Sequence, residues 1–267
     1  RTIPVGPFLV VLVGAISAQT IANVVNDLYD ARTGLDRPDN AGAMNALVRG
    51  IVSEKEARAI VLVASAIALV CAALAIVRVG PPIVPWLVGG GLVAFFYTAP
   101  PIALKRRALG DLAVAFGFGV GYAAGAALVA TGGEPSPEVR TRVWLWAVPA
   151  IALVVAILHA NNHRDREADR ANGARTLANS LSLGRSRAVL LGLVGGAYAW
   201  TAGLALFVSP WAGLPLLTFP LAVPLLRRAA RDDVGGMYVP EIAKLHGLFG
   251  GALALALALV PLAPPGR

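Results

Sequence analysis

The sequence predicts an all-α fold, a polytopic membrane bundle in which eight helices are visible. Hydrophobic residues make up 57% of the 267-residue chain and charged residues only 14%, against about 25% charged residues in an average soluble domain. The mean hydropathy is +0.70, so the chain has too little charge to cover a water-exposed surface. Apolar runs of about 20 residues, the length of one membrane crossing, recur along it. Lipid is therefore expected to be the main solvent.

Hydropathy places the eight helices between short Pro- and Gly-rich breaks. They are expected at residues 6–26, 56–78, 82–98, 110–131, 143–162, 187–208, 211–227 and 244–263. Residues 1–267 are interpreted as a single transmembrane domain. The one cysteine, Cys71, lies in an apolar run, which excludes intrachain disulfides and cysteine-cluster metal sites.

Charge alternates between the two sides of the predicted bundle. Of the 23 Lys and Arg residues, 18 fall in the segments 27–58, 99–109, 163–187 and 227–244, which the positive-inside rule assigns to the cytoplasm. The net charge of +8 is thus expected to serve orientation and contact with anionic headgroups, not nucleic acid. Thirteen of the 15 acids lie in or beside the same segments, which the rule does not predict. A site that needs both signs of charge is expected at the cytoplasmic face.

Two acidic clusters follow predicted membrane spans. The first has the helical spacing i, i+3, i+4 and i+7, and it consists of Asn23, Asn26, Asp27 and Asp30. The second has the spacing i, i+4 and i+8, and it consists of Asn161, Asp165 and Asp169. Each set occupies one face of a helix. Carboxylates that face each other repel unless cations neutralise them, and all-oxygen ligands favour Mg²⁺.

The two clusters share a repeated sequence pattern. Asp30 is followed by Gly34 and Asp169 by Gly173, each four residues on, and the clusters follow the first and fifth predicted helices. This pattern suggests two pseudo-repeated four-helix halves around a central cavity, with the functional site where the halves meet.

Basic residues accompany the acids on the same side. Four of them are candidates for binding phosphate oxygens and stabilising a departing pyrophosphate: Arg49, Lys105, Arg164 and Arg175. Six others are assigned to orientation and headgroup contact: Arg106, Arg107, Arg185, Arg187, Arg227 and Arg228. His159, His163 and His246 are too few and too scattered for a typical zinc site. His163 is expected either at a solvated helix end or against a substrate.

Several motifs resemble the UbiA superfamily of intramembrane prenyltransferases across nearly the whole chain. The first acidic cluster, with Gly34, Asp36 and Arg49-Gly50 after it, resembles the first motif of that family. Phe96-Tyr97-Thr98, Lys105 and Leu109-Gly110-Asp111 resemble its middle cytoplasmic loop. The stretch from Asn161 to Asp169, then Gly173 and Arg175 to Ala178, closely resembles the second motif of the branch that prenylates 1,4-dihydroxy-2-naphthoate, and so does Lys244 to Gly250 on the last helix.

The resemblance implies a Mg²⁺-dependent transfer of a polyprenyl group from its diphosphate to an aromatic acceptor, most simply 1,4-dihydroxy-2-naphthoate in menaquinone biosynthesis. Asp27, Asp30, Asp165 and Asp169 are then expected to bind two Mg²⁺ ions, directly or through water. Asn23, Asn26 and Asn162 are expected to supply neutral oxygen ligands or to orient carboxylates. Phe96, Tyr97 and Tyr29 are candidates for sheltering the allylic carbocation, and Asp111 for accepting a proton.

This sequence departs from the family pattern in two respects. The family usually has nine helices, and with eight the parity of crossings puts residue 1 opposite the acidic segments. A helix absent near residues 5–6 accounts for both facts; a short member with its amino terminus outside is the alternative. Ala174 stands where many relatives have Lys, so pyrophosphate contacts there are expected from neighbours such as Arg175.

Three other functions compete with this interpretation. An intramembrane terpene cyclase of the same superfamily ionises the same diphosphate without an acceptor, and a prenyltransferase can use a different acceptor. An ion-coupled transporter is expected to carry acids near mid-membrane on broken helices, whereas these acids cluster at one face beside cations.

Overall fold

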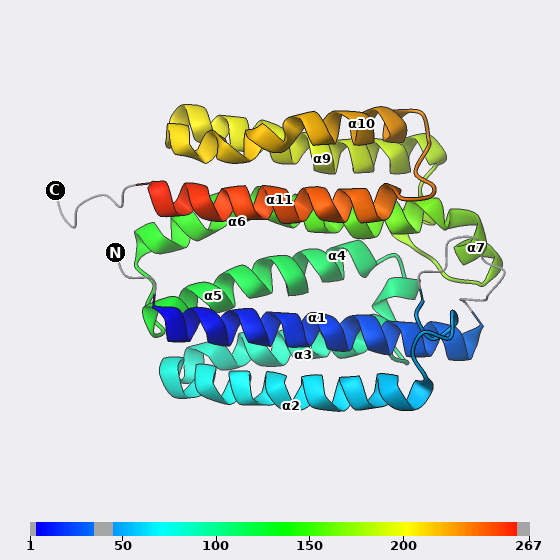
Figure 1. The fold of residues 1–267 in the computed structure, drawn as a ribbon, viewed down its shortest axis with the longest axis horizontal. Coiled ribbons are helices and arrows are strands. Elements are labelled where there is room, and N and C mark those ends of the chain that lie inside the picture. Colours follow the sequence, from blue (N-terminus) through cyan, green and yellow to red (C-terminus); the bar gives the residue numbers. More distant parts are fainter. Residues whose placement is uncertain (1–3, 35–44, 261–267) are drawn as a thin grey trace.

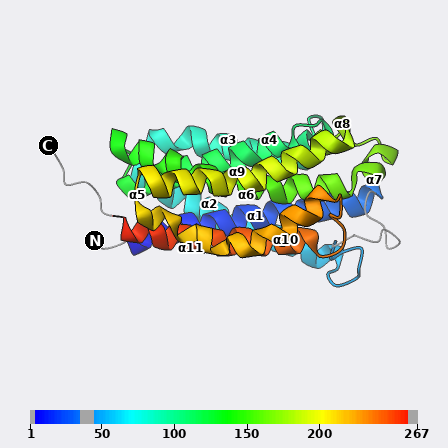
Figure 2. The ribbon, with the colours of Figure 1, turned by 90° about the horizontal axis from the view of Figure 1, so that it is seen from above.

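The computed structural model describes residues 4–34 and 45–260, which form an elongated bundle of nearly parallel and antiparallel helices (Figures 1 and 2). The elements are α1 (Val5–Thr33), α2 (Glu54–Val79), η1 (Pro81–Ile83), α3 (Val84–Thr98), η2 (Leu104–Arg106), α4 (Gly110–Val114), η3 (Ala115–Gly121), α5 (Tyr122–Thr131), α6 (Pro137–Arg164), α7 (Arg166–Ala171), α8 (Leu177–Ser180), α9 (Leu183–Phe207), η4 (Pro210–Thr218), α10 (Phe219–Ala230) and α11 (Tyr238–Leu259). The predicted all-α class is confirmed.

All eight predicted helices correspond to elements of the structure. Within the described residues, seven segments are long and apolar enough to cross a membrane. The eighth, predicted at 211–227, is formed by η4 followed by α10, with Pro215 and Pro224 inside these two helices. Proline removes a backbone donor and clashes with the preceding turn, so this crossing is not one regular α-helix.

Left-handed glycines follow both helices that carry the acidic clusters. Gly34 has φ +69° and caps α1, so that Asp27 and Asp30 lie in the last two turns of that helix. Gly173 has φ +68° after α7, which carries Asp169. Glycine adopts this conformation without the steric penalty of a Cβ atom. The repeated spacing of four residues from Asp to Gly therefore corresponds to a left-handed glycine after each acidic helix.

The helices separate into two groups that meet along α6 (Figure 1). On one side α6 packs against α9 and α11, and on the other against α4, η3 and α5, while α1 packs mainly against α2. The larger buried core lies where α9, η4, α10 and α11, here called the second group of helices, pack on α6, and it is centred on residues such as Trp146, Leu153, Leu190 and Phe249. This arrangement agrees with the predicted halves of four crossings each.

An apolar cavity of about 500 Å³ lies between the two groups. Its walls come from α1, η3, α5 and α6, with a single residue from α11. This volume falls within the usual range for small-molecule sites. The predicted central cavity is therefore present, and Asn23 on α1 places the first acidic cluster at its edge.

Gly119 keeps η3 and α6 close beside the cavity. A Cβ atom at this position would come within 2.8 Å of Cγ1 and Cγ2 of Ile151 on α6, and a β-branched side chain in a helix has little rotamer freedom to move away. We expect Gly119→Ala to destabilise the protein by about 1–3 kcal/mol, as overpacking does. Thermal unfolding in detergent measures this effect. The matched comparison is Gly119→Ala introduced into Ile151→Ala, where the substitution should cost much less than in the wild type; equal costs in both backgrounds would contradict the steric cause.

Candidate active site

The charged connections gather at one end of the bundle, here called the polar end. It comprises residues 45–53, 99–109, 165–182 and 231–237, whereas α1 begins and α11 ends at the opposite end (Figure 1). Val5 therefore lies on the side that the parity argument predicted for the amino terminus. The absence of a helix near residues 5–6 stays a prediction, and Asp36 lies outside the described residues.

Lys105 of η2 binds the first acidic cluster. Its Nζ donates to Oδ1 of Asn26 at 2.7 Å and to Oδ1 of Asp30 at 2.5 Å, and Nδ2 of Asn26 donates to the other oxygen of Asp30 at 2.8 Å. The exposed fractions of the Lys105 and Asp30 side chains are 12% and 8%. The ammonium also lies 6.0 Å from the ring centre of Tyr29, within cation–π range. Lys105 and Asp30, which are 75 residues apart in the sequence, thus form an ion pair that is largely shielded from water.

Arg164 binds the second acidic cluster. Its Nε and Nη2 donate to the two carboxylate oxygens of Asp165 at 2.7 and 2.6 Å, and Nη2 also donates to Oδ1 of Asn161 at 2.8 Å. A bidentate ion pair of this kind fixes the relative orientation of the guanidinium and carboxylate groups. In this arrangement Arg164 orients Asp165, a role that was not part of the prediction.

Asp169 connects the two clusters electrostatically. Burial raises the pKa of its carboxyl group to about 7, with further upward contributions from Asp165 and Asp30, while Lys105 and Arg106 act to lower it. Charged groups from α1, from η2, from α7 and from the junction between α6 and α7 therefore interact electrostatically with one another. Arg106, which was assigned to lipid headgroups, takes part in this interaction as well.

Tyr97 lies between the clusters at the end of α3. It is within electrostatic range of Asp111, Asp30 and Asp169, and its ring lies beside Gly110 at the start of α4. An aromatic face surrounded by carboxylates lies where a developing cation would be held.

The middle loop and the second motif are joined through their backbones. The Arg175 amide donates to the Arg106 carbonyl at 3.1 Å, the Ala108 amide donates to the Arg175 carbonyl at 2.5 Å, and Nη2 of Arg106 donates to the Asn172 carbonyl at 3.0 Å. The Arg175 side chain is exposed and its Nε reaches Oγ of Ser180 at 3.4 Å. The backbone of Arg175 thus places Lys105 and its loop relative to the second cluster.

Arg49 is the predicted site residue with the least support. Nδ2 of Asn45 donates to the Asp27 carbonyl at 2.8 Å and anchors the segment to α1. The Arg49 side chain, however, is exposed. No hydrogen bond or ion pair of its guanidinium is found in residues 4–34 and 45–260.

The donor set suits Mg²⁺ shared with a substrate better than a protein-only metal cage. In the described part of the chain, no three His, Cys, Asp or Glu side chains converge on one point. Carboxylates of both clusters nevertheless lie within electrostatic range of one another, because burial first, and then Asp165 and Asp30, raise the pKa of Asp169. Mg²⁺ commonly takes one or two carboxylates together with waters and phosphate oxygens, so these residues fit that ion.

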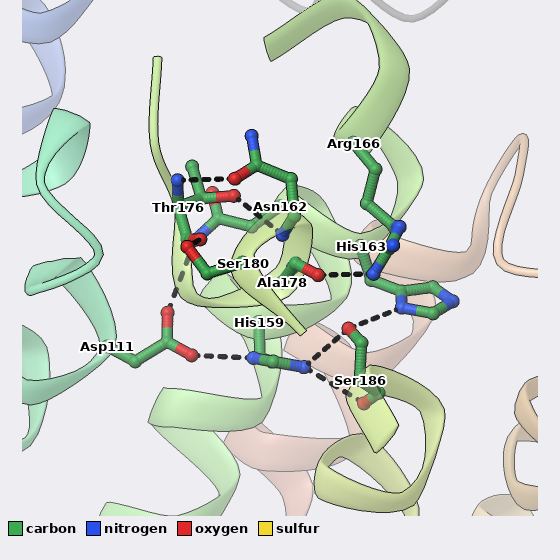
Figure 3. Close-up of polar contacts among 10 residues, drawn as sticks. Asp111, His159, Asn162, His163, Arg166, Thr176, Ala178, Ser180 and Ser186 are labelled. Carbon is green, nitrogen blue, oxygen red and sulfur yellow. Dashed lines mark hydrogen bonds and ion pairs between the residues drawn. The ribbon is translucent and has the colours of Figure 1, made fainter. Parts of the chain in front are cut away.

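A buried polar network, which the sequence did not predict, extends from Asp111 through α6 and α9 (Figure 3). Nδ1 of His159 lies 2.6 Å from Oδ2 of Asp111, and Nε2 of His159 lies 3.1 Å from Oγ of Ser186. The same Oγ lies 2.7 Å from Nδ1 of His163, whose Nε2 lies 2.7 Å from Oδ1 of Asp232. His159 and Ser186 are fully buried. The network links α4 to the α10–α11 connection.

His163 is therefore neither solvated nor aimed at a substrate, and both expectations for it were wrong. Its exposed fraction is 4%, because α9 and the α10–α11 connection cover it. Asn162, in contrast, orients a carboxylate as predicted: its Nδ2 donates to Oδ1 of Asp111 at 3.2 Å. The sequence did not show which carboxylate Asn162 orients, because Asp111 on α4 meets Asn162 on α6 only in the folded protein.

The network satisfies its buried polar groups with one another. Within the described residues, each buried side-chain nitrogen or oxygen atom has a hydrogen-bond partner. This pairing lowers the cost of burying the aspartates.

Comparison with known proteins places these features in a family. The model of the UbiA prenyltransferase family matches residues 1–235. The chain belongs to the UbiA prenyltransferase family. This UbiA protein is accordingly a prenyltransferase and an integral membrane protein, as the motifs and the apolar helices predicted.

Named relatives and solved structures agree with this assignment. The chain is 30% identical to 1,4-dihydroxy-2-naphthoate octaprenyltransferase of Escherichia coli K12, over 84% of the chain and 75% of that protein. It is 29% identical to UbiA prenyltransferase domain-containing protein 1 of Dictyostelium discoideum, over 94% of the chain and 76% of that protein. An apo UbiA homologue from Aeropyrum pernix K1 superposes with a TM-score of 0.73 at 21% identity, over 96% and 92% of the two chains. A UbiA homologue from Archaeoglobus fulgidus, bound to DMAPP and Mg²⁺, gives a TM-score of 0.53 at 17% identity, over 93% and 89%.

Proposed function

We propose that this UbiA protein transfers a polyprenyl group from its diphosphate to 1,4-dihydroxy-2-naphthoate in a Mg²⁺-dependent reaction. The observation that carries the proposal is the meeting of two acidic clusters around Lys105 beside an apolar cavity of about 500 Å³. The polar end suits a diphosphate and the cavity suits hydrophobic reactants. The naphthoate prenyltransferases among the relatives support the choice of acceptor.

The diphosphate is proposed to bind at the polar end. Asp27, Asp30, Asp165 and Asp169 would hold Mg²⁺ together with phosphate oxygens, and the DMAPP and Mg²⁺ of the A. fulgidus homologue support this assignment. When bound, Mg²⁺ neutralises charge on the leaving diphosphate. Lys105 contributes a further positive charge at the same place, where it is partly shielded from water and thus electrostatically effective.

The allylic group is proposed to ionise at the edge of the cavity, beneath the acidic clusters. Apolar walls exclude the water that would otherwise capture the carbocation. Tyr97 and Tyr29 lie near the carboxylates, and their aromatic rings are proposed to shelter the cation. Asp111, held by His159 and Asn162, is proposed to accept the proton that the acceptor loses.

The polar end is proposed to face the cytoplasm. Eighteen of the 23 Lys and Arg residues fall in the four sequence segments that contain its connections, as the positive-inside rule requires for the cytoplasmic side. Phosphorylated and charged substrates would then reach the site from the cytoplasm, while the isoprenoid chain enters lipid.

Acceptor dependence tests the function. With farnesyl diphosphate and Mg²⁺, the purified chain in nanodiscs should yield a prenylated product only when 1,4-dihydroxy-2-naphthoate is present, as measured by product mass. Chelation with EDTA should lower the rate by about 100-fold or more, because loss of preorganised charge stabilisation has effects of this size, and added Mg²⁺ should restore it. A cyclised hydrocarbon formed without acceptor would instead establish a terpene cyclase.

A further inference from the structure

We propose that His246 of α11 binds the acceptor, by hydrogen bonding to an aromatic hydroxyl group in the central cavity. The inference rests on the proposed function and adds a substrate-binding residue to it. His246 is the single residue through which α11 contributes to the cavity wall. The other walls come from α1, η3, α5 and α6, so the imidazole closes the cavity from the second group of helices.

Four polar side chains besides His246 line the cavity, and each takes part in at least one hydrogen bond within the protein. Nε2 of Gln19 donates to Oδ1 of Asn23 at 3.0 Å, Oγ1 of Thr20 donates to the Ile16 carbonyl at 2.8 Å, and the Tyr122 hydroxyl donates to the Ala15 carbonyl at 3.3 Å. No hydrogen bond of the His246 imidazole is found within the described residues, and its side chain is half-buried.

Measured from the polar end, His246 lies deeper in the bundle than the first acidic cluster. It lies eight residues after the start of α11 at Tyr238, or about 12 Å into the helix at 1.5 Å per residue. Asn23, which also lines the cavity, lies ten residues before the end of α1 at Thr33, or about 15 Å from that end by the same rise. Both helix ends are at the polar end, and α1 reaches further in that direction than α11 does (Figure 1). The imidazole therefore lies at the level just below the diphosphate site, where the acceptor ring must meet the allylic carbon.

The chemistry of the imidazole selects the group that it binds. A neutral imidazole offers one donor and one acceptor, as does a phenolic hydroxyl group. The surrounding wall is apolar, so an ionic contact with a carboxylate is disfavoured there. A prenyl chain offers no hydrogen-bonding group at all, which leaves the acceptor as the reactant that His246 recognises.

Kinetics of His246→Phe test the proposal. With farnesyl diphosphate, Mg²⁺ and 1,4-dihydroxy-2-naphthoate, we expect the KM for the naphthoate to rise about 10-fold or more, since a buried hydrogen bond is lost, and the KM for farnesyl diphosphate to stay unchanged. His246→Gln, which keeps a donor and an acceptor, should recover much of the effect. It also keeps the test valid if the Phe variant does not fold. Tyr198→Phe is the matched control, because its hydroxyl group is bonded to Thr218 away from the cavity, and it should leave the naphthoate KM unchanged.

Acceptor analogues sharpen the test. The wild-type protein should discriminate against 1-hydroxy-2-naphthoate or 4-hydroxy-2-naphthoate, each lacking one hydroxyl group, and His246→Phe should abolish one of these two preferences. A parallel rise in both KM values, or unchanged discrimination in His246→Phe, would overturn the inference. If the wild-type protein forms no prenylated naphthoate at all, the proposed function fails instead, so the two failures are distinct.

Discussion

Replacing Lys105 by Gln is expected to lower kcat for prenyl transfer by about 100-fold or more, the scale on which removal of a transition-state charge contact acts. The ammonium donates to Asn26 and Asp30 and contributes to the electrostatic field at Asp169. It is therefore placed between the two clusters where charge develops on a leaving diphosphate. Steady-state rates in nanodiscs at saturating Mg²⁺ measure the loss.

Two control variants separate catalysis from folding in this prediction. Lys55→Gln removes an exposed lysine at the start of α2 at the same end of the bundle, and its kcat should stay near that of the wild type. Lys105→Gln leaves Asp30 buried without its cation, whereas Lys105→Gln with Asp30→Asn removes both charges and should regain thermal stability but not activity. Equal activity of the Lys105 and Lys55 variants would refute the role of Lys105.

Replacing His159 by Leu is expected to destabilise the protein by about 3 kcal/mol or more, which is the usual cost of removing one partner of a buried charged pair. His159 is fully buried, and its contacts with Asp111 and Ser186 are the centre of the network. The variant leaves a carboxylate with an exposed fraction of 5% short of a partner. A fall in the thermal unfolding midpoint in detergent measures the effect.

The pair can be tested by a double-mutant cycle. His159→Leu with Asp111→Leu should be less destabilised than the sum of the two single variants, because neither buried group is then left unpaired. Ser186→Ala is the milder comparison, with an expected loss of about 1–3 kcal/mol, since it leaves both imidazoles without their shared hydroxyl group. Additive losses in the cycle would show that Asp111 and His159 do not interact.

Local patterns were sufficient for the membrane helices and for the first acidic face. The second set was predicted on a single helix, but a break at Asp165 divides it between α6 and α7. Apolar runs must be helical in lipid because each backbone donor and acceptor has to be satisfied within the segment. The spacing from Asn23 to Asp30 likewise fixes one helix face, and the left-handed glycines after both clusters could be anticipated from their equal spacing. These features depend only on near neighbours in the chain.

Other features depended on contacts between distant segments. Nothing in the spacing of His159, His163 and Ser186 indicates that they share hydrogen bonds, and each looked unremarkable on its own helix. Arg106 resembled its basic neighbours until the fold placed it near Asp169. His246 likewise becomes a candidate only because α11 faces the cavity.

The sequence by itself determined that this is an all-helical membrane prenyltransferase of the UbiA family with acids at one end. Composition, helical periodicity and short motifs carry that information because they act within one turn of helix or one membrane span. The tertiary structure alone decided how the charges are paired: Lys105 with Asp30, Arg164 with Asp165 and His159 with Asp111. The first and last of these pairs join helices far apart in the sequence, and Arg164 faces its sequence neighbour only because of how α6 ends. Such pairing depends on distance and burial, which arise only when the helices pack.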